Sequence, residues 1–401
     1  MNNKTDGKER GTDVADMKGR YRTAVEDKFP DEFNIELKKE SGLRYGENPN
    51  QSAAIYSLKG TSLAELTDIR LAKTGKGGIS ATNMMDVTRA LDILKFFNNR
   101  PSVAVMKHLI PCGFATQFNN NSLDNIYTLA RDADARSAFG SVVVSTRPVD
   151  KATAEAIIST FVEGVAAPYF EKGVMDILET KKDLRVLLYS NIDKIPKFIG
   201  DDIKDLYDIK WLPTGRVIVQ KPYLSSIRSV KDLILDPMVV KEDEKGTKIK
   251  YVVERDPTKR EVNDLLTAWY INLGVRSNGI VFVKDGVSVA IGSGQQERVG
   301  AVEQAIIKAY QKAMDREKIE HYDSLHGILS KGRLETNPLE DAVCSSDGFF
   351  PFPDSISLMG REGVSAIIQP GGSINDDKII RIANSHKMAM VYTLERCFAH
   401  F

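Results

Sequence analysis

The sequence is poor in cysteine and has no excess of charge of either sign. Its 401 residues contain three cysteines, Cys112, Cys344 and Cys397, which lie far apart and are odd in number. This spacing excludes a disulfide framework and a C-x-x-C zinc or redox pair, and it favours a reducing, cytoplasmic compartment. Lys plus Arg and Asp plus Glu both number 55, so the formal net charge is zero. No global field would steer the protein toward nucleic acid or an anionic membrane, and an anion must therefore bind at a local site.

The chain also lacks long apolar runs. No run approaches the length of about 18 residues that a membrane span needs, and the N-terminus has no apolar segment typical of a secretion signal. We therefore expect a soluble protein that is not exported. Residues 1–28 contain no Leu, Ile or Phe. Since such a segment buries little apolar surface, residues 1–36 are predicted to form a flexible polar tail.

Beyond this tail, helix and strand patterns alternate, which predicts the α/β class. Apolar residues recur at helical spacing over Met84–Phe97, and a buried strand at Val103–Met106 is expected to end in a Pro-Cys-Gly turn. A second series contains a helix at 261–272, two strands joined by an Asp285-Gly286 turn, and a helix at 303–316. We expect two units, at 37–215 and 216–401. No sequence repeat relates them, so any duplication would be structural only.

Lys107 and His108 stand side by side where the predicted strand ends. In the mouth of a cleft, desolvation would lower both pKa values and make a neutral imidazole available as a base. The alternative is a surface histidine capped by a turn, and we favour the functional interpretation. Cys112 nearby is interpreted as a small buried turn residue rather than a nucleophile.

Other segments fit both ligand binding and ordinary structure. The glycine turns at 292–298 and 369–373 each lie between a strand and a helix, where backbone N–H groups can face an anion, although simple tight turns fit equally well. The turn at 292–298 matches neither a dinucleotide nor a P-loop fingerprint. The recurrence of the same strand–glycine–helix arrangement at 369–373 favours a second ligand-contacting loop there. The aromatic run 349–354 either fills a core or lines a slot for a ring system. Arg44 beside Tyr45 suits a phosphate or carboxylate on a ring-bearing ligand, although a surface arginine is the simpler interpretation.

Together these segments resemble one known family. It is the transformylase part of the bifunctional purine-biosynthesis enzyme, which formylates AICAR (5-aminoimidazole-4-carboxamide ribonucleotide) using 10-formyltetrahydrofolate. The similar segments, in order, are LRYGENPNQ (43–51), the Asn83–Asp86 helix start, VMKHLIPCG (105–113), SAFG (137–140), DLLTAW (264–269), RSNGIV (276–281), IGSGQQERV (291–299), SDGFFPFPD (346–354), IIQPGGSI (367–374) and the Arg396–His400 tail. Their number and order argue against a chance resemblance.

The resemblance implies a fold and partners. The implied fold is two cytidine-deaminase-like α/β units in tandem, with active sites at a homodimer interface. No zinc is expected, because the His/Cys/Cys ligand signature of the deaminases is missing from the sequence, whereas the resemblance allows a monovalent cation. Only residues 1–42 precede the first motif, which is too few for the family's cyclohydrolase domain. A separate IMP cyclohydrolase is therefore implied.

The resemblance also implies roles for individual residues. Lys107 and His108 become the catalytic pair, and Asn278 would form a hydrogen bond near the same centre. His108 would accept the proton that leaves the 5-amino group of AICAR, and Lys107 would stabilise the developing oxyanion or donate toward N10 of the folate. The implied nucleotide-binding residues are Arg44, Tyr45, Asn83, Arg396 and Phe398, and the implied folate-binding residues are Gln295, Arg298, Phe349, Phe352 and Asp354.

Two positions depart from the family pattern. Asn50 stands where the family usually has a histidine of the active site, and asparagine keeps a hydrogen bond but cannot carry a proton. Ser80-Ala81-Thr82-Asn83 replaces a SYNN-like segment that contacts the nucleotide. An alternative of another class is a catalytically weakened paralogue that binds the purine nucleotide as a regulatory module. Turnover of AICAR with 10-formyltetrahydrofolate would distinguish the two.

Overall fold

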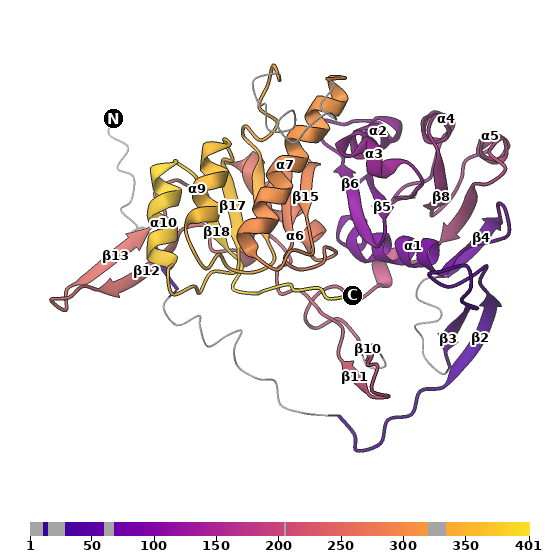
Figure 1. Cartoon of the computed structure of the whole chain (residues 1–401), viewed down its shortest axis with the longest axis horizontal. Helices are drawn as coiled ribbons and strands as arrows, with labels where there is room; N and C mark the ends of the chain where they lie inside the picture. The colour runs from indigo at the N-terminus through magenta and orange to yellow at the C-terminus, as the bar shows by residue number, and fades with distance from the viewer. Residues whose placement is uncertain (1–10, 15–28, 60–67, 204–205, 320–333) are drawn as a thin grey trace, which may run out of the picture.

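The computed structural model describes residues 11–14, 29–59, 68–203, 206–319 and 334–401. Its main feature is a mixed sheet of eleven strands with helices packed against it, which confirms the predicted α/β class (Figure 1). The strand order is β18-β17-β16-β14-β15-β6-β5-β7-β8-β9-β4. The strands are β4 (Ile69–Lys73), β5 (Ser102–Lys107), β6 (Ile110–Thr116), β7 (Ser141–Ser145), β8 (Val162–Ala167), β9 (Arg185–Tyr189), β14 (Ile280–Lys284), β15 (Val287–Gly292), β16 (Val343–Ser346), β17 (Ala366–Gln369) and β18 (Ala389–Tyr392).

The sheet consists of two halves with the same topology. In the first half, β5 pairs antiparallel with β6 and β7, and β8 and β9 continue in parallel beyond β7. In the second half, β14 pairs antiparallel with β15 and β16, and β17 and β18 continue in parallel. The halves meet where β15 pairs with β6 through Val287 and Ala115. The two halves of the sheet therefore share one strand topology that no sequence repeat reveals, while the cytidine-deaminase-like fold and the boundaries of the two units stay predictions.

The helices also occupy equivalent places in the two halves. One helix precedes each first hairpin, α1 (Ala81–Leu94) and α6 (Lys259–Asn272), and one helix follows it, α2 (Leu123–Ala133) and α7 (Arg298–Arg316). α1 and α6 share a hydrophobic core on one face of the sheet. The opposite face has a separate core in each half. The other α-helices of the described residues are α3 (Ala135–Ala138), α4 (Lys151–Ile158), α5 (Val174–Glu179), α9 (Asp354–Arg361) and α10 (Asp376–Ser385).

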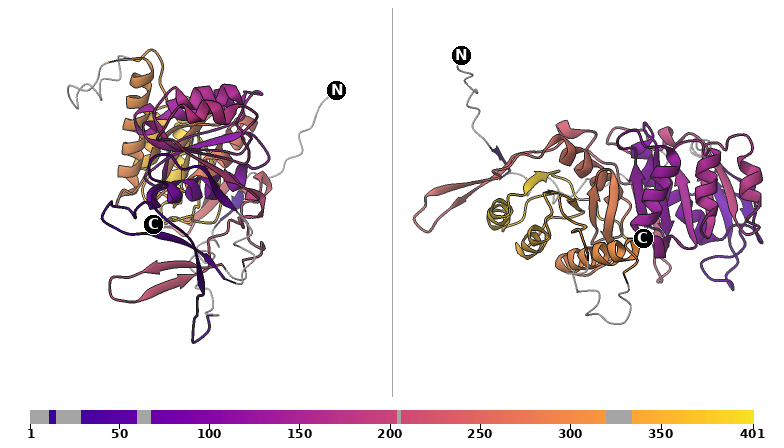
Figure 2. Two further views of the ribbon diagram at one scale, coloured as in Figure 1. Left: turned by 90° about the vertical axis from the view of Figure 1, so that its right-hand side faces the viewer. Right: turned by 90° about the horizontal axis from the view of Figure 1, so that it is seen from above.

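In the part of the chain that the structure describes, three small sheets lie outside the main sheet (Figures 1 and 2). Two are hairpins, β2 (Leu37–Gly42) with β3 (Ala54–Leu58), and β10 (Asp208–Trp211) with β11 (Val217–Gln220). The third combines β1 (Thr12–Asp13), β12 (Pro237–Glu242) and β13 (Lys248–Val252). β1 lies within the predicted polar tail, and Val14 beside it is buried. The tail prediction is therefore wrong for residues 11–14, because Val14 packs into the core of the second half; most of residues 1–28 lies outside the described residues.

The turn after β5 differs from the prediction. Residues Pro111–Gly113 belong to β6, and the chain reverses instead at His108 and Leu109, with φ angles of 55° and 68°. Left-handed backbone in two-residue hairpins is usually signalled by Gly or Asn. Because neither residue type is present at these positions, the pattern gave no sign of the turn.

Candidate active site

The tight turn between β5 and β6 presents His108. The imidazole is exposed at the end of a strand whose other residues are mostly buried. The turn is fixed by a hydrogen bond to α1, in which the Leu109 N–H donates to Asp86 Oδ1 at 2.7 Å. α1 itself begins at Ser80, whose hydroxyl accepts the N–H of Asn83 as an N-cap. The position of His108 is thus set by a buried helix rather than by the turn sequence alone.

Lys107 is held beside the start of β7. Its Nζ donates to the carbonyl oxygens of Gly140 at 2.6 Å and Phe139 at 3.2 Å. Gly140 has a φ of +69°, and a Cβ at this position would lie 3.0 Å from Lys107 Nζ. Two of the three ammonium N–H groups are therefore used to orient the side chain, and the third can donate to a substrate.

Asp86 is a buried acidic group that contacts the turn carrying this pair, because its carboxyl accepts the Leu109 N–H. Its side chain is 3% exposed. Burial raises the pKa of the Asp86 carboxyl to about 6, while the Leu109 N–H and the charges of His108 and Lys107 oppose the rise. Glu163 raises the same pKa further. Protonation of Asp86 therefore falls in a pH range in which enzymes are commonly assayed.

Three of the predicted nucleotide-binding residues gather around the N-terminus of α1. The Arg44 N–H donates to Ile79 O at 2.9 Å, and Tyr45 O accepts the N–H of Ala81 at 3.0 Å, so this loop lies against the helix start. Asn83 Nδ2 donates to Glu163 Oε2 at 3.0 Å. Sequence reasoning missed Glu163, because a single acidic residue in a strand has no distinguishing pattern.

Asn278 and the glycine loop 292–297 form a second group, in the other half of the sheet. Both N–H groups of the Asn278 amide donate into this loop, to Gln295 O at 2.8 Å and to Gln296 O at 3.1 Å. This orientation leaves Asn278 Oδ1 to accept a hydrogen bond from a ligand. The loop connects β15 to α7, as predicted from the glycine pattern.

Arg298 and the C-terminal tail complete the second group. The Arg298 guanidinium is buried and forms an ion pair with Asp347, which is 0% exposed. The Asp347 carbonyl accepts the Cys397 N–H at 3.0 Å, so the tail is tied to the same place. The guanidinium carbons of Arg396 and Arg298 lie 5.0 Å and 5.9 Å from the centre of the Phe398 ring. Since Arg298 already neutralises Asp347, this carboxylate does not need a bound metal cation as a partner. The monovalent cation stays a prediction.

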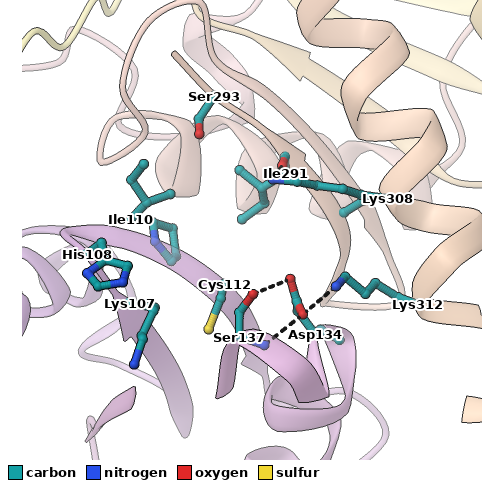
Figure 3. A pocket seen from close by; sticks show the side chains of 13 residues that line it. Lys107, His108, Ile110, Cys112, Asp134, Ser137, Ile291, Ser293, Lys308 and Lys312 are labelled. Atoms are coloured by element: carbon teal, nitrogen blue, oxygen red, sulfur yellow. Dashed lines mark hydrogen bonds and ion pairs between the residues drawn. The ribbon is translucent and has the colours of Figure 1, made fainter. Parts of the chain in front are cut away.

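A cavity of about 220 Å³ lies between the two halves (Figure 3). Lys107, His108 and Cys112 line it from the first half, and Ser293 lines it from the glycine loop of the second. Its other basic residues, from α7, already have partners: Lys312 pairs with Asp134 at 2.7 Å, and Lys308 donates to Ile291 O at 3.0 Å. Burial raises the pKa of the Cys112 thiol to about 12, so the thiol stays protonated at neutral pH, in line with its interpretation as a structural residue.

The aromatic run is divided between core and surface. Phe350 is fully buried in the core of the second half, whereas Phe352 is 59% exposed. Phe349 is half-buried, and Asp354 is exposed at the start of α9. The folate role of Phe349, Phe352 and Asp354 stays a prediction. Asn50 is exposed in the turn before β3.

Among the described residues, no group of three His, Cys, Asp or Glu side chains is arranged to hold a metal ion. Of the helices described, none combines the length and apolar character needed to cross a bilayer.

A family model and individual relatives of this chain indicate the same family. A family model described as AICARFT/IMPCHase bienzyme matches residues 14–308. The bifunctional purine biosynthesis protein PurH of Magnetococcus marinus is 36% identical over 376 residues, which are 93% of this chain and 62% of that protein. PurH of Persephonella marina is 35% identical over 94% of this chain and 62% of its own length, and PurH of Caldicellulosiruptor saccharolyticus is 35% identical over 93% and 61%.

The chain thus spans about three fifths of the length of these relatives. The match extends over nearly the whole chain and includes both halves of the sheet as well as the segments that hold Lys107, His108 and Asn278. This chain therefore belongs to the AICARFT/IMPCHase bienzyme family.

Proposed function

We propose that this chain transfers the formyl group of 10-formyltetrahydrofolate to the 5-amino group of AICAR, giving formyl-AICAR in purine biosynthesis. Membership of the family supports the reaction class. The observation that carries the proposal is the turn that fixes Lys107 and His108 at the mouth of a cavity between the halves. A base and a cation, each held by other parts of the fold, are what this transfer requires.

In the proposed reaction, the amino nitrogen of AICAR attacks the formyl carbon and forms a C–N bond. That amine is conjugated with its ring and is a weak nucleophile, so its proton must leave during the attack. His108 accepts this proton, which is help worth ~10²–10⁴ in rate. The remaining N–H of Lys107 donates to the oxyanion of the tetrahedral intermediate. The bond between the formyl carbon and N10 then breaks, N10 takes up the proton, and tetrahydrofolate leaves.

Substrate orientation is assigned to the residues around this pair. Asn278 Oδ1, which its amide orientation leaves as an acceptor, would receive a hydrogen bond from the attacking amino group. Arg44 and Tyr45 lie next to the helix start that carries Asn83, and this group would hold the nucleotide. Arg396 and Phe398, which lie in the C-terminal tail, would bind the same ligand from the second half.

A homodimer with shared active sites is part of the proposal. Phe352 and Asp354, predicted to contact folate, lie exposed on the second half. The β10–β11 hairpin also extends from the body with Trp211 80% exposed and Ile218 47% exposed (Figure 1). Apolar side chains on such a hairpin are typical of a surface that a second protein copy covers. Light scattering of the purified chain, with Trp211→Lys as the disrupting variant, tests this part.

The reaction itself is tested by incubating the purified chain with AICAR and 10-formyltetrahydrofolate. Formation of tetrahydrofolate and formyl-AICAR in equal amounts would support the proposal. Binding of AICAR without turnover would instead favour the alternative, a nucleotide-binding module without catalysis. A formyl-AICAR rate equal to the rate without protein would overturn the proposed activity.

A further inference from the structure

The matching topology of the two halves places two buried aspartates at the same position. Asp86 is the sixth residue of α1, and Asp264 is the sixth residue of α6. Each helix precedes the first hairpin of its half, and each carboxyl-bearing residue is 3% exposed. A carboxylate is costly to bury without hydrogen-bond partners. A buried aspartate at the same position in both halves therefore indicates the same structural role in each.

That task is to hold the turn of the hairpin. Asp264 accepts the N–H groups of Asp285 at 2.9 Å and Gly286 at 2.8 Å. Asp86 accepts the Leu109 N–H at 2.7 Å. Both turns have two residues with positive φ, and in the β5–β6 turn neither of the two is glycine. The strained turn that carries His108 therefore depends on its aspartate more than the Asp285–Gly286 turn does.

The two aspartates differ in how their charge is balanced. Asp264 forms an ion pair at 3.2 Å with Arg260, one helical turn earlier. The corresponding residue of α1 is Thr82, which carries no charge. The charged groups that face Asp86 are His108 and Lys107 from the β5–β6 hairpin and Glu163 from β8. In the first half, the groups whose charges oppose the raised pKa of the aspartate are thus the proposed catalytic side chains.

We propose that Asp86 is a positioning residue for the reaction. It holds the His108–Leu109 turn, and its negative charge keeps the side chains of Lys107 and His108 in the positions that catalysis requires. This inference rests on the proposed function of that pair. Protonation of the carboxyl replaces a charge-assisted hydrogen bond with a weaker neutral one and removes the charge. Since burial raises the pKa of Asp86 to about 6, protonation of Asp86 contributes to the loss of activity on acidification.

The test compares Asp86 with its structural counterpart. Asp86→Ala is expected to lower kcat at least tenfold at pH 7.5, with the KM for AICAR changed less than twofold. Asp264→Ala removes the equivalent support from a turn without catalytic side chains and should leave kcat within twofold. Asp86→Asn keeps an acceptor for the Leu109 N–H and removes only the charge. In this variant the acid limb of log kcat against pH should be less steep than in the unaltered protein, because the titration of Asp86 is gone.

A second readout does not depend on turnover. The imidazole NMR signal of His108, assigned by its loss in His108→Ala, should shift in Asp86→Asn and stay unchanged in Asp264→Asn. If the unaltered protein has no formyl transferase activity but the signal responds in this way, the proposed function fails and the positioning contact stands. Asp86→Asn with an unchanged imidazole signal and an unchanged acid limb would overturn the inference, even if Asp86→Ala does not fold.

Discussion

Replacing Gly140 with alanine tests how far the position of Lys107 matters. Gly140 has a φ of +69°, a conformation that costs a residue with a side chain about 1–2 kcal/mol. The added Cβ would also lie 3.0 Å from Lys107 Nζ and 3.4 Å from Phe161 Cε1. Because Lys107 Nζ donates to Gly140 O at 2.6 Å, moving away from the methyl group weakens the bond that orients it. A misplacement on the order of 1 Å can cost ~10²-fold in rate. We therefore expect kcat of Gly140→Ala to fall by roughly 10- to 100-fold.

Gly246→Ala separates the two effects of this change. Gly246 lies between β12 and β13 with a φ of +77°, and a Cβ there meets no atom within 4 Å. Both variants should lose the stability that a positive φ costs a residue with a side chain, about 1–2 kcal/mol in urea unfolding, but only Gly140→Ala should lose formyl transfer in steady-state kinetics. If Gly140→Ala kept a kcat within twofold of the unaltered protein, the fixed position of Lys107 would not be a requirement of catalysis.

Four other outcomes are expected. His108→Ala should abolish formyl transfer and leave AICAR binding by calorimetry nearly intact, since a proton acceptor acts mainly in the transition state; near-normal kcat would remove His108 from the mechanism. Asn50→His should change kcat/KM little, whereas an acid limb displaced by about one pH unit would show that the missing histidine tunes the catalytic charge. The 401-residue chain should convert formyl-AICAR to IMP no faster than background by chromatography, because its motifs all match the transformylase part. Asp86→Asn should raise the free energy of unfolding by on the order of 1–3 kcal/mol at pH 7.5 and by less at pH 5. Because its pKa is raised in the folded protein, Asp86 stabilises the fold fully only below about pH 4, and this contribution is lost as the pH rises through about 6; an equal gain at both pH values would contradict this.

The sequence predicts the parts of the fold that local patterns encode. The helix at α6 and the hairpin at Asp285-Gly286 follow from apolar periodicity and from a glycine suited to positive φ. The His108–Leu109 turn does not follow, because its conformation is imposed by Asp86 from a helix 22 residues earlier in the chain. The shared strand topology of the two halves also does not follow from the sequence, because no sequence repeat accompanies it. A strand order can persist after side chains have diverged.

The candidate site is predicted where adjacent residues carry the chemistry and missed where the contact is long-range. Lys107 and His108 could be identified because they stand together at a strand end. Glu163 could not, because its relation to Asn83 spans 80 positions. The burial of Arg298 against Asp347 likewise depends on how the C-terminal tail and β16 come together, which no local pattern encodes.

The most direct measurement of the central claim is the rate of formyl-AICAR formation from AICAR and 10-formyltetrahydrofolate by the purified chain, compared with His108→Ala under the same conditions. We expect formyl-AICAR in equal amounts with tetrahydrofolate, and loss of this product in the variant while AICAR still binds. Saturable AICAR binding by the unaltered protein without any formyl-AICAR above background would contradict it.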